Sequence, residues 1–195
     1  MANRQVALIR GINVGRAKRV AMADLRALVT ELGYRDVSTL LNSGNVVFTV
    51  PGAGRGDPAA RIERAMSDRL GVTARVLVLT AAEVAAIMAG NPLGRVAADP
   101  SRLLVTVLAN PADRARLVPL TRRDWAPEAL GLGGRVAYLW CPVGILKSPV
   151  AEAVGGVLGD RATARNWATM TKLHGLLGSE GEVSRRRSTS EPAGD

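Results

Sequence analysis

The chain has 195 residues, of which 47% are hydrophobic, so it can bury a core as one large domain or two small ones. No apolar run approaches the roughly 18 residues that a membrane span requires, and the first residues lead into an apolar segment without a secretory leader. The single cysteine, Cys141, excludes an internal disulfide and a cysteine-based metal cluster, and we expect a cytoplasmic protein with no membrane partner.

The formal net charge of +9 is unevenly distributed along the chain. Residues 4–19 contain five basic side chains and no acid, and the stretch from Arg161 to Lys172 holds a second acid-free group. The tail from Gly178 onward is slightly acidic. The positive charge therefore belongs to the folded body, which would attract anionic partners.

The first half of the chain predicts the element order β-α-β-β-α-β. Between residues 22 and 32 apolar side chains recur at helical spacing, and Asp57-Pro58 is a typical start for a second helix. The segment Asn42-Ser43-Gly44 is a hairpin signal between two strands. Strands are expected over 5–9, 36–41, 45–50 and 75–79.

The second half repeats this order after a linking segment. Thr80 to Glu83 fits a capping box that opens a linking helix to about residue 89, and 91–101 is a connector. Strands are expected over 102–108, 128–132, 135–141 and near 163–166, and helices after Asn110, after Ser148 and over 167–177. Pro119 would end the first of these helices early.

These elements predict an α+β fold made of a tandem pair of ferredoxin-like (βαββαβ) halves, with a linking helix and a C-terminal helix. The first half would cover 1–79, the linking helix and connector 80–101, and the second half with its C-terminal helix 102–177. A disordered tail would cover 178–195, because that segment is polar and lacks periodicity.

Four polar segments could bind an anion, because they combine basic or amide donors with turn residues and contain almost no acids. They are the loop 10–16 after the first strand, the hairpin 42–45, the loop 144–149 and the segment 163–172. The candidate ligand-binding residues are Arg10, Asn13, Asn42, Ser43, Asn45, Lys147, Arg165, Asn166, Trp167 and Lys172.

Each segment also has a structural interpretation, which the residue types alone favour. Asparagine and glycine are the usual residues of tight hairpins, Ser148 is a plain N-cap, and Trp167 is most simply a core anchor. The single histidine, His174, excludes a multi-histidine metal site, and no residue has a visible catalytic partner. The sequence therefore predicts no metal or cofactor and names no catalytic residue.

The same segments together resemble a bacterial family of uncharacterised proteins, domain-of-unknown-function family sixteen-ninety-seven. The resemblance rests on residues 7–15 with 22–26 behind them, on 42–48, on Tyr138 with Gly144, and on 163–167 followed by Lys172-Leu173. It implies tandem ferredoxin-like halves and no established activity. It also implies that the polar residues shared with the family could equally bind a ligand or stabilise the fold.

Three functions fit these residues. The first is a protein that binds a nucleotide or nucleic acid in a cleft between the halves. Arg10 and Arg165 would hold an anionic group of this ligand. Asn13, Asn42 and Asn45 would orient the ligand, and Trp167 would stack on a planar moiety of it. The second is an enzyme acting on a phosphorylated or carboxylated small molecule, and the third is a structural or interaction protein whose motifs hold the halves together. The third predicts that Arg10→Ala lowers stability. The sequence leaves the oligomeric state open.

Overall fold

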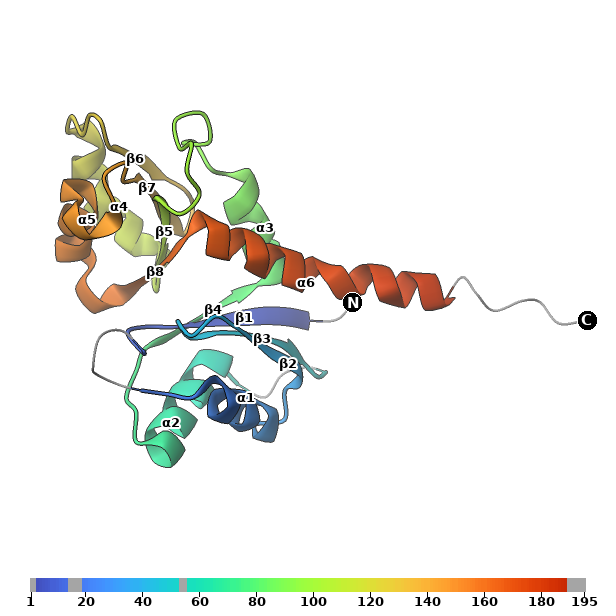
Figure 1. Ribbon diagram of the computed structural model, residues 1–195. Helices are drawn as coiled ribbons and strands as arrows, with labels where there is room; N and C mark the ends of the chain where they lie inside the picture. The colour runs from blue at the N-terminus through green and yellow to red at the C-terminus, as the bar shows by residue number, and fades with distance from the viewer. Residues whose placement is uncertain (1–2, 14–18, 53–55, 189–195) are drawn as a thin grey trace, which may run out of the picture.

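The computed structural model describes residues 3–13, 19–52 and 56–188, with side chains described as far as Gly178. Within these residues the protein is an α+β fold with two four-stranded sheets and six α-helices (Figure 1). The elements in chain order are β1 (Asn3–Ile9), α1 (Met22–Glu31), β2 (Arg35–Leu40), β3 (Asn45–Val50), α2 (Pro58–Leu70), β4 (Val76–Thr80), α3 (Ala81–Ala89), β5 (Leu103–Leu108), α4 (Arg114–Leu117), β6 (Ala129–Leu132), β7 (Val136–Trp140), α5 (Pro149–Leu158), β8 (Ala162–Asn166) and α6 (Trp167–Ser188). Short 3-10 helices flank α4 and α5: η1 (Pro111–Asp113), η2 (Val118–Arg122), η3 (Ile145–Lys147) and η4 (Gly159–Arg161).

The two sheets have the same arrangement of strands. The first sheet has the order β2-β3-β1-β4 and the second has the order β6-β7-β5-β8, and every neighbouring pair is antiparallel. In each half the first and third strands of the chain segment are central, and the second and fourth form the edges. The fold therefore consists of two repeated halves, as the order of sequence signals indicated.

Local sequence signals explain where the elements begin and end. Thr80 forms the expected capping box, because its hydroxyl accepts from the Glu83 N–H while the Glu83 carboxylate accepts from the Thr80 N–H. Asp57, Asn110 and Ser148 cap the helices that follow them, each with proline in the first turn. Pro119 leaves α4 only four residues long, between two 3-10 segments.

The last helix is longer than predicted. We expected it to end at Leu177 and to be followed by a disordered tail, but α6 continues to Ser188. Extension of a helix that is already nucleated costs little, and glutamate and arginine, which recur beyond Leu177, are good helix formers. The remaining part of the predicted tail, 189–195, lies outside the described residues.

The helices and sheets form layers (Figure 1), and three hydrophobic cores lie between these layers. The outer face of the first sheet packs against α1 and α2, and the outer face of the second sheet packs against the α4 and α5 side. The inner faces of both sheets share a third core with α3 and α6, which contains Val6 and Leu8 from the first half and Val105 and Tyr138 from the second. The two halves are therefore joined by buried apolar surface. No helix in the described part of the chain has the length and apolarity needed to cross a membrane.

Candidate functional site

Arg165 on β8 crosses from the second half to the first. Its position on β8 pairs with Val105, so its side chain faces the first sheet. There its Nε donates to Asn45 Oδ1 (2.5 Å) and its Nη2 donates to the carbonyls of Ile9 (2.9 Å) and Ser43 (2.9 Å). Further bonds run from Nη2 to the Gly44 carbonyl (3.3 Å) and from Nη1 within β8 itself. All five N–H groups of the guanidinium are therefore satisfied by protein acceptors.

These acceptors carry no formal charge. Arg165 as a whole is 9% exposed, and the described residues give its guanidinium carbonyl, amide and hydroxyl oxygens but no carboxylate. Burial lowers the pKa of Arg165 to about 10, which leaves it protonated at neutral pH. A buried positive charge without a counter-charge raises the electrostatic potential around it, so a nearby cavity would favour an anion.

Arg10 makes the opposite crossing, from the first half to the second. Its Nη1 donates to the carbonyls of Gly159 and Ala162 (3.0 Å to Ala162). The Ala162 carbonyl points outward from β8, which is an edge strand of its sheet, so Arg10 also covers part of an open edge. All hydrogen bonds of Arg10 found among the described residues use Nη1, which leaves Nε and Nη2 available for a ligand.

The amides of the first loop and the hairpin hold the backbone that Arg165 contacts. Asn45 is fully buried and donates to the Leu40 carbonyl (2.8 Å) and to the Ser43 hydroxyl (3.0 Å). Asn13 donates to the carbonyls of Val20 and Asn42 and accepts from the Val20 N–H. These side chains therefore position the hairpin, and through it the acceptors of Arg165.

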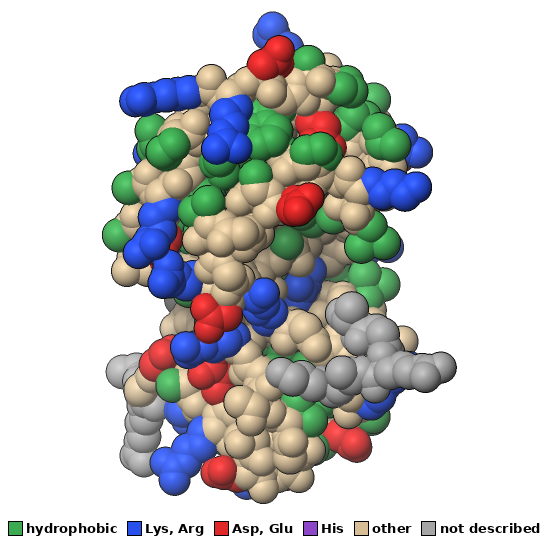
Figure 2. Space-filling model, turned by 90° about the vertical axis from the view of Figure 1, so that its left-hand side faces the viewer, with side chains coloured by type: hydrophobic (Ala, Val, Ile, Leu, Met, Phe, Trp, Pro, Cys, Tyr) green, Lys and Arg blue, Asp and Glu red, His purple; other side chains and the backbone are tan. Residues whose placement is uncertain are grey.

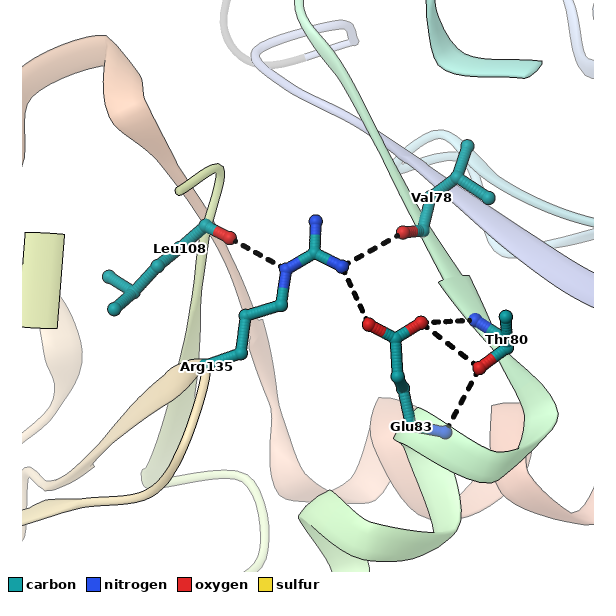
Figure 3. A network of polar contacts seen from close by, with 5 residues as sticks. All are labelled: Val78, Thr80, Glu83, Leu108 and Arg135. Carbon is teal, nitrogen blue, oxygen red and sulfur yellow. Dashed lines mark hydrogen bonds and ion pairs between the residues drawn. The ribbon is translucent and has the colours of Figure 1, made fainter. Parts of the chain in front are cut away.

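A second polar contact between the halves involves Arg135, which precedes β7 (Figure 3). Its Nε donates to the Leu108 carbonyl (3.0 Å), and its Nη1 donates to the Glu83 carboxylate (2.7 Å) and to the Val78 carbonyl (3.4 Å). Val78 lies on the edge strand of the first sheet. Arginine thus caps an edge carbonyl of each sheet, Arg135 on β4 and Arg10 on β8.

The Glu83 carboxylate gives this contact a pH dependence. Burial tends to raise the pKa of Glu83, but the hydrogen bonds from the Thr80 N–H and from Arg135 outweigh it and hold the pKa below its ordinary value of 4.5. Because the unfolded chain then binds the proton first, stability should be lost as the pH falls below about that value. We expect Glu83→Gln to reduce this acid-dependent loss, measured by urea denaturation from neutral pH downward. Glu152→Gln, at an exposed position on α5, controls for removal of a carboxylate, and equal pH slopes in wild type and Glu83→Gln would contradict the role of Glu83.

The remaining predicted residues lie apart from these contacts. Asn166 caps α6 by accepting from the Thr169 N–H, and Trp167 packs into the shared core with its ring 6.4 Å from that of Tyr138. Lys147 on η3 and Lys172 on α6 are exposed. The structure therefore brings together Arg10, Asn13, Ser43, Asn45 and Arg165, with the Asn42 backbone, and it gives Asn166, Trp167 and the two lysines other surroundings.

Two cavities adjoin the contacts between the halves. The larger one, about 430 Å³, lies between α2 and β4 of the first half and the Ala109, Arg135 and η4 region of the second. Three arginines line it, but so do three acids, so its net charge is balanced. The acids include Asp57, which caps α2, and Glu63, which accepts from the Val76 N–H.

The smaller cavity, about 340 Å³, has a different chemistry. It lies between α5 and the outer face of the second sheet, and both Arg10 and Arg165 line it. Leu104, Leu139 and Val154 form an apolar floor, and no carboxylate is among the described residues that line it. Its exposed rim consists of glycines, Gly11, Gly155 and Gly159. Figure 2 shows lysine and arginine side chains, with acidic side chains among them, at the waist where the two lobes meet.

Sequence reasoning identified the arginines of this cavity but missed its walls. Thr106, Leu104 and Leu139 belong to ordinary strands, and only the fold turns them toward α5. The pair Gly155-Gly156 on α5 did indicate a cavity beside this helix. Glycine in a helix interior costs about 1 kcal/mol relative to alanine, so its presence there suggests that a side chain would occupy needed space. No group of three or more histidine, cysteine, aspartate or glutamate side chains in the described residues could hold a metal ion.

Comparison with known proteins agrees with this architecture. Residues 2–138 match the family described as "Protein of unknown function (DUF1697)", and the chain belongs to this family. The fold is similar to that of conserved bacterial protein SP0830 from Streptococcus pneumoniae, with a TM-score of 0.74 and 22% sequence identity over 91% of this chain and 99% of that one. A comparison with curated proteins gives no match. The resemblance to this family that the sequence indicated is therefore confirmed.

Proposed function

We propose that the protein binds a small anionic ligand in the 340 Å³ cavity between α5 and the second sheet. One observation carries this proposal: Arg10 and Arg165 line the same cavity as an apolar floor, with no carboxylate among its described lining residues. At an effective dielectric constant of about 20, an anion and an arginine whose opposite unit charges lie 4 Å apart attract each other by about 4 kcal/mol. Arg10 would supply the direct hydrogen bonds, because Arg165 has no N–H group left.

The volume fits a ligand of metabolite size. Small-molecule sites are typically about 300–1,000 Å³, largely apolar and equipped with a few polar groups, which matches this cavity. A long nucleic acid would instead need an extended basic surface, whose affinity falls steeply with salt. The balanced charge of the larger cavity supports it less well as an anion site.

The test fills the cavity without touching either arginine. Gly155 and Gly156 are adjacent on α5, both are exposed, and an added Cβ would meet no atom within 4 Å at either position. Only Gly155 lines the cavity. We expect Gly155→Leu to weaken ligand binding by about tenfold or more and Gly156→Leu to leave it unchanged, since both gain the same helix propensity.

The readout is a thermal-shift titration of the full chain with carboxylates, phosphate esters and mononucleotides at low and moderate salt. A ligand at about 100 times its Kd should stabilise the protein by about 2.7 kcal/mol, and a site inside the fold should keep most of this effect at the higher salt. Stabilisation by every polyanion that disappears with salt, or equal binding by the two leucine variants, would contradict the proposal.

A structural role for the same polar residues is supported independently. Arg10 and Arg165 bond to carbonyls of the opposite half, and these bonds favour the third of the functions considered from the sequence. The two roles are compatible, because Arg10 uses one nitrogen for the opposite half and retains two others. We also assign each half to the ferredoxin-like topology, since the sheet orders β2-β3-β1-β4 and β6-β7-β5-β8 support the split βαβ arrangement.

A further inference from the structure

Resting on the proposed function, we infer that the ligand of the 340 Å³ cavity is an unbranched aliphatic chain with an anionic head, a carboxylate or a phosphate monoester. The inference comes from the chemistry of the walls, from the shape that the strand register imposes, and from the position of Arg10, whose hydrogen bonds found among the described residues all use Nη1. Each of these is independent of the net charge that supports anion binding in general.

The walls of the cavity are aliphatic. Leucine, valine and alanine side chains from β5, β7, β8 and α5 form them, and none of the described lining residues is aromatic. A nucleobase is usually recognised by stacking on an aromatic ring together with hydrogen bonds to its polar edge. Trp167, the predicted stacking residue, is instead packed against the shared core. The cavity therefore lacks the means to recognise a planar base.

Polar side chains in the cavity are few. The Thr106 hydroxyl lies on the outer face of the second sheet, the face that Leu104 and Leu108 also share. Thr163 lies on the opposite face with Arg165, where its hydroxyl accepts from Arg165 Nη1. A sugar phosphate, with several hydroxyls to satisfy, would find one hydroxyl on this wall, so its desolvation would be poorly compensated.

The register gives the cavity a long axis. Ala162, whose carbonyl accepts from Arg10, pairs with Leu108 at one end of β5. Leu104 pairs with Leu139 at the other end, about 13 Å away along the strand. An anionic head at Arg10 would therefore place a linear chain along β5 toward Leu104 and Leu139. The glycine rim leaves the space above this line open.

The experiment is a calorimetric titration of the full chain with two homologous series, n-alkyl carboxylates and n-alkyl phosphates, each below its critical micelle concentration. Inorganic phosphate and adenosine monophosphate are the references. The Kd should fall about fourfold for each added methylene until the chain exceeds about 13 Å, and then stop falling. The series that binds tighter at equal chain length identifies the head group.

Variants separate this inference from the proposed function. Gly155→Leu should shorten the chain length at which affinity stops rising, whereas Gly156→Leu should not. Thr106→Val, which keeps the side-chain shape and removes the hydroxyl, should leave alkyl affinity unchanged or increase it. A several-fold loss in Thr106→Val, or tighter binding of adenosine monophosphate than of the alkyl phosphates, would overturn the aliphatic assignment and leave anion binding intact. Affinity that does not depend on chain length would overturn it too, and no binding by any anion would end both proposals.

Discussion

Arg165→Ala is expected to lower the free energy of unfolding by about 3–5 kcal/mol. The substitution removes every hydrogen bond that the guanidinium makes and leaves the carbonyls of Ile9 and Ser43 and the amide oxygen of fully buried Asn45 without this donor. Unsatisfied buried acceptors cost more than the net value of the bonds themselves. Urea denaturation followed by circular dichroism measures the change.

Two controls identify the cause. Arg165→Met keeps most of the side-chain volume but has no donors, so it should be nearly as destabilising as alanine if hydrogen bonding rather than packing dominates. Arg64→Ala, on a side chain that is 86% exposed, should change stability by about 0.5 kcal/mol or less. A loss below about 1 kcal/mol in Arg165→Ala would mean that the hydrogen bonds of Arg165 contribute little to holding the halves together.

Gly44→Ala is expected to cost about 2–4 kcal/mol through two combined effects. Gly44 has φ +76°, a conformation that L-residues disfavour, and it is the last residue of the turn in the β2–β3 hairpin. A Cβ at this position would lie 2.7 Å from Ile12 Cδ1 and 3.0 Å from Ile9 Cβ. The Ile9 Cβ cannot move independently of its backbone, so the hairpin itself would have to shift away from β1 and from Arg165.

The matched control for Gly44 is Gly52→Ala. Gly52 has a similar φ of +66°, but an added Cβ there would meet nothing within 4 Å. It should therefore show the backbone strain alone, about 1 kcal/mol. Urea midpoints of the two variants give the steric part by difference, and equal midpoints would show that the contact between the hairpin and the first loop is not tight.

Much of the fold could be predicted because its signals are local. The capping box at Thr80, the proline-led helix starts and the glycine-containing hairpins each depend on neighbouring residues, and the structure has them where they were expected. The end of α6 was missed because apolar periodicity stops at Leu177 while helix extension does not depend on burial. The core shared by α3, α6 and both sheets could not be predicted from local signals, because it depends on how the halves dock.

The sequence indicated which donor side chains the candidate site contains, but not which acceptors they would meet. Ser43, Asn45 and Arg165 are joined by hydrogen bonds, and Arg10 lines the same cavity as Arg165. Their acceptors, however, are largely backbone carbonyls brought in from the opposite half, and a sequence does not say which carbonyl a donor will meet. For the same reason Arg135 was overlooked, because its partners Val78 and Glu83 are distant along the chain.

The double use of Arg10 suggests how docking and binding are related. One terminal nitrogen bonds to the second half beside Ala162, and Arg10 also lines the cavity that the second half encloses. Among the described lining residues, Arg10 comes from the first half and the walls come from the second, so the cavity is complete only when the halves are docked. Ligand binding should therefore also favour docking, by the general linkage between binding and stability.

The most direct test of anion binding in this cavity is a crystal structure of the full chain grown with an n-alkyl phosphate. We expect density for the phosphate group within hydrogen-bond distance of Arg10 Nε or Nη2, with the alkyl chain running along β5 toward Leu104 and Leu139. Density for the phosphate on the outer surface, or in the larger cavity beside Arg75 and Arg161, with the 340 Å³ cavity free of ligand, would contradict it.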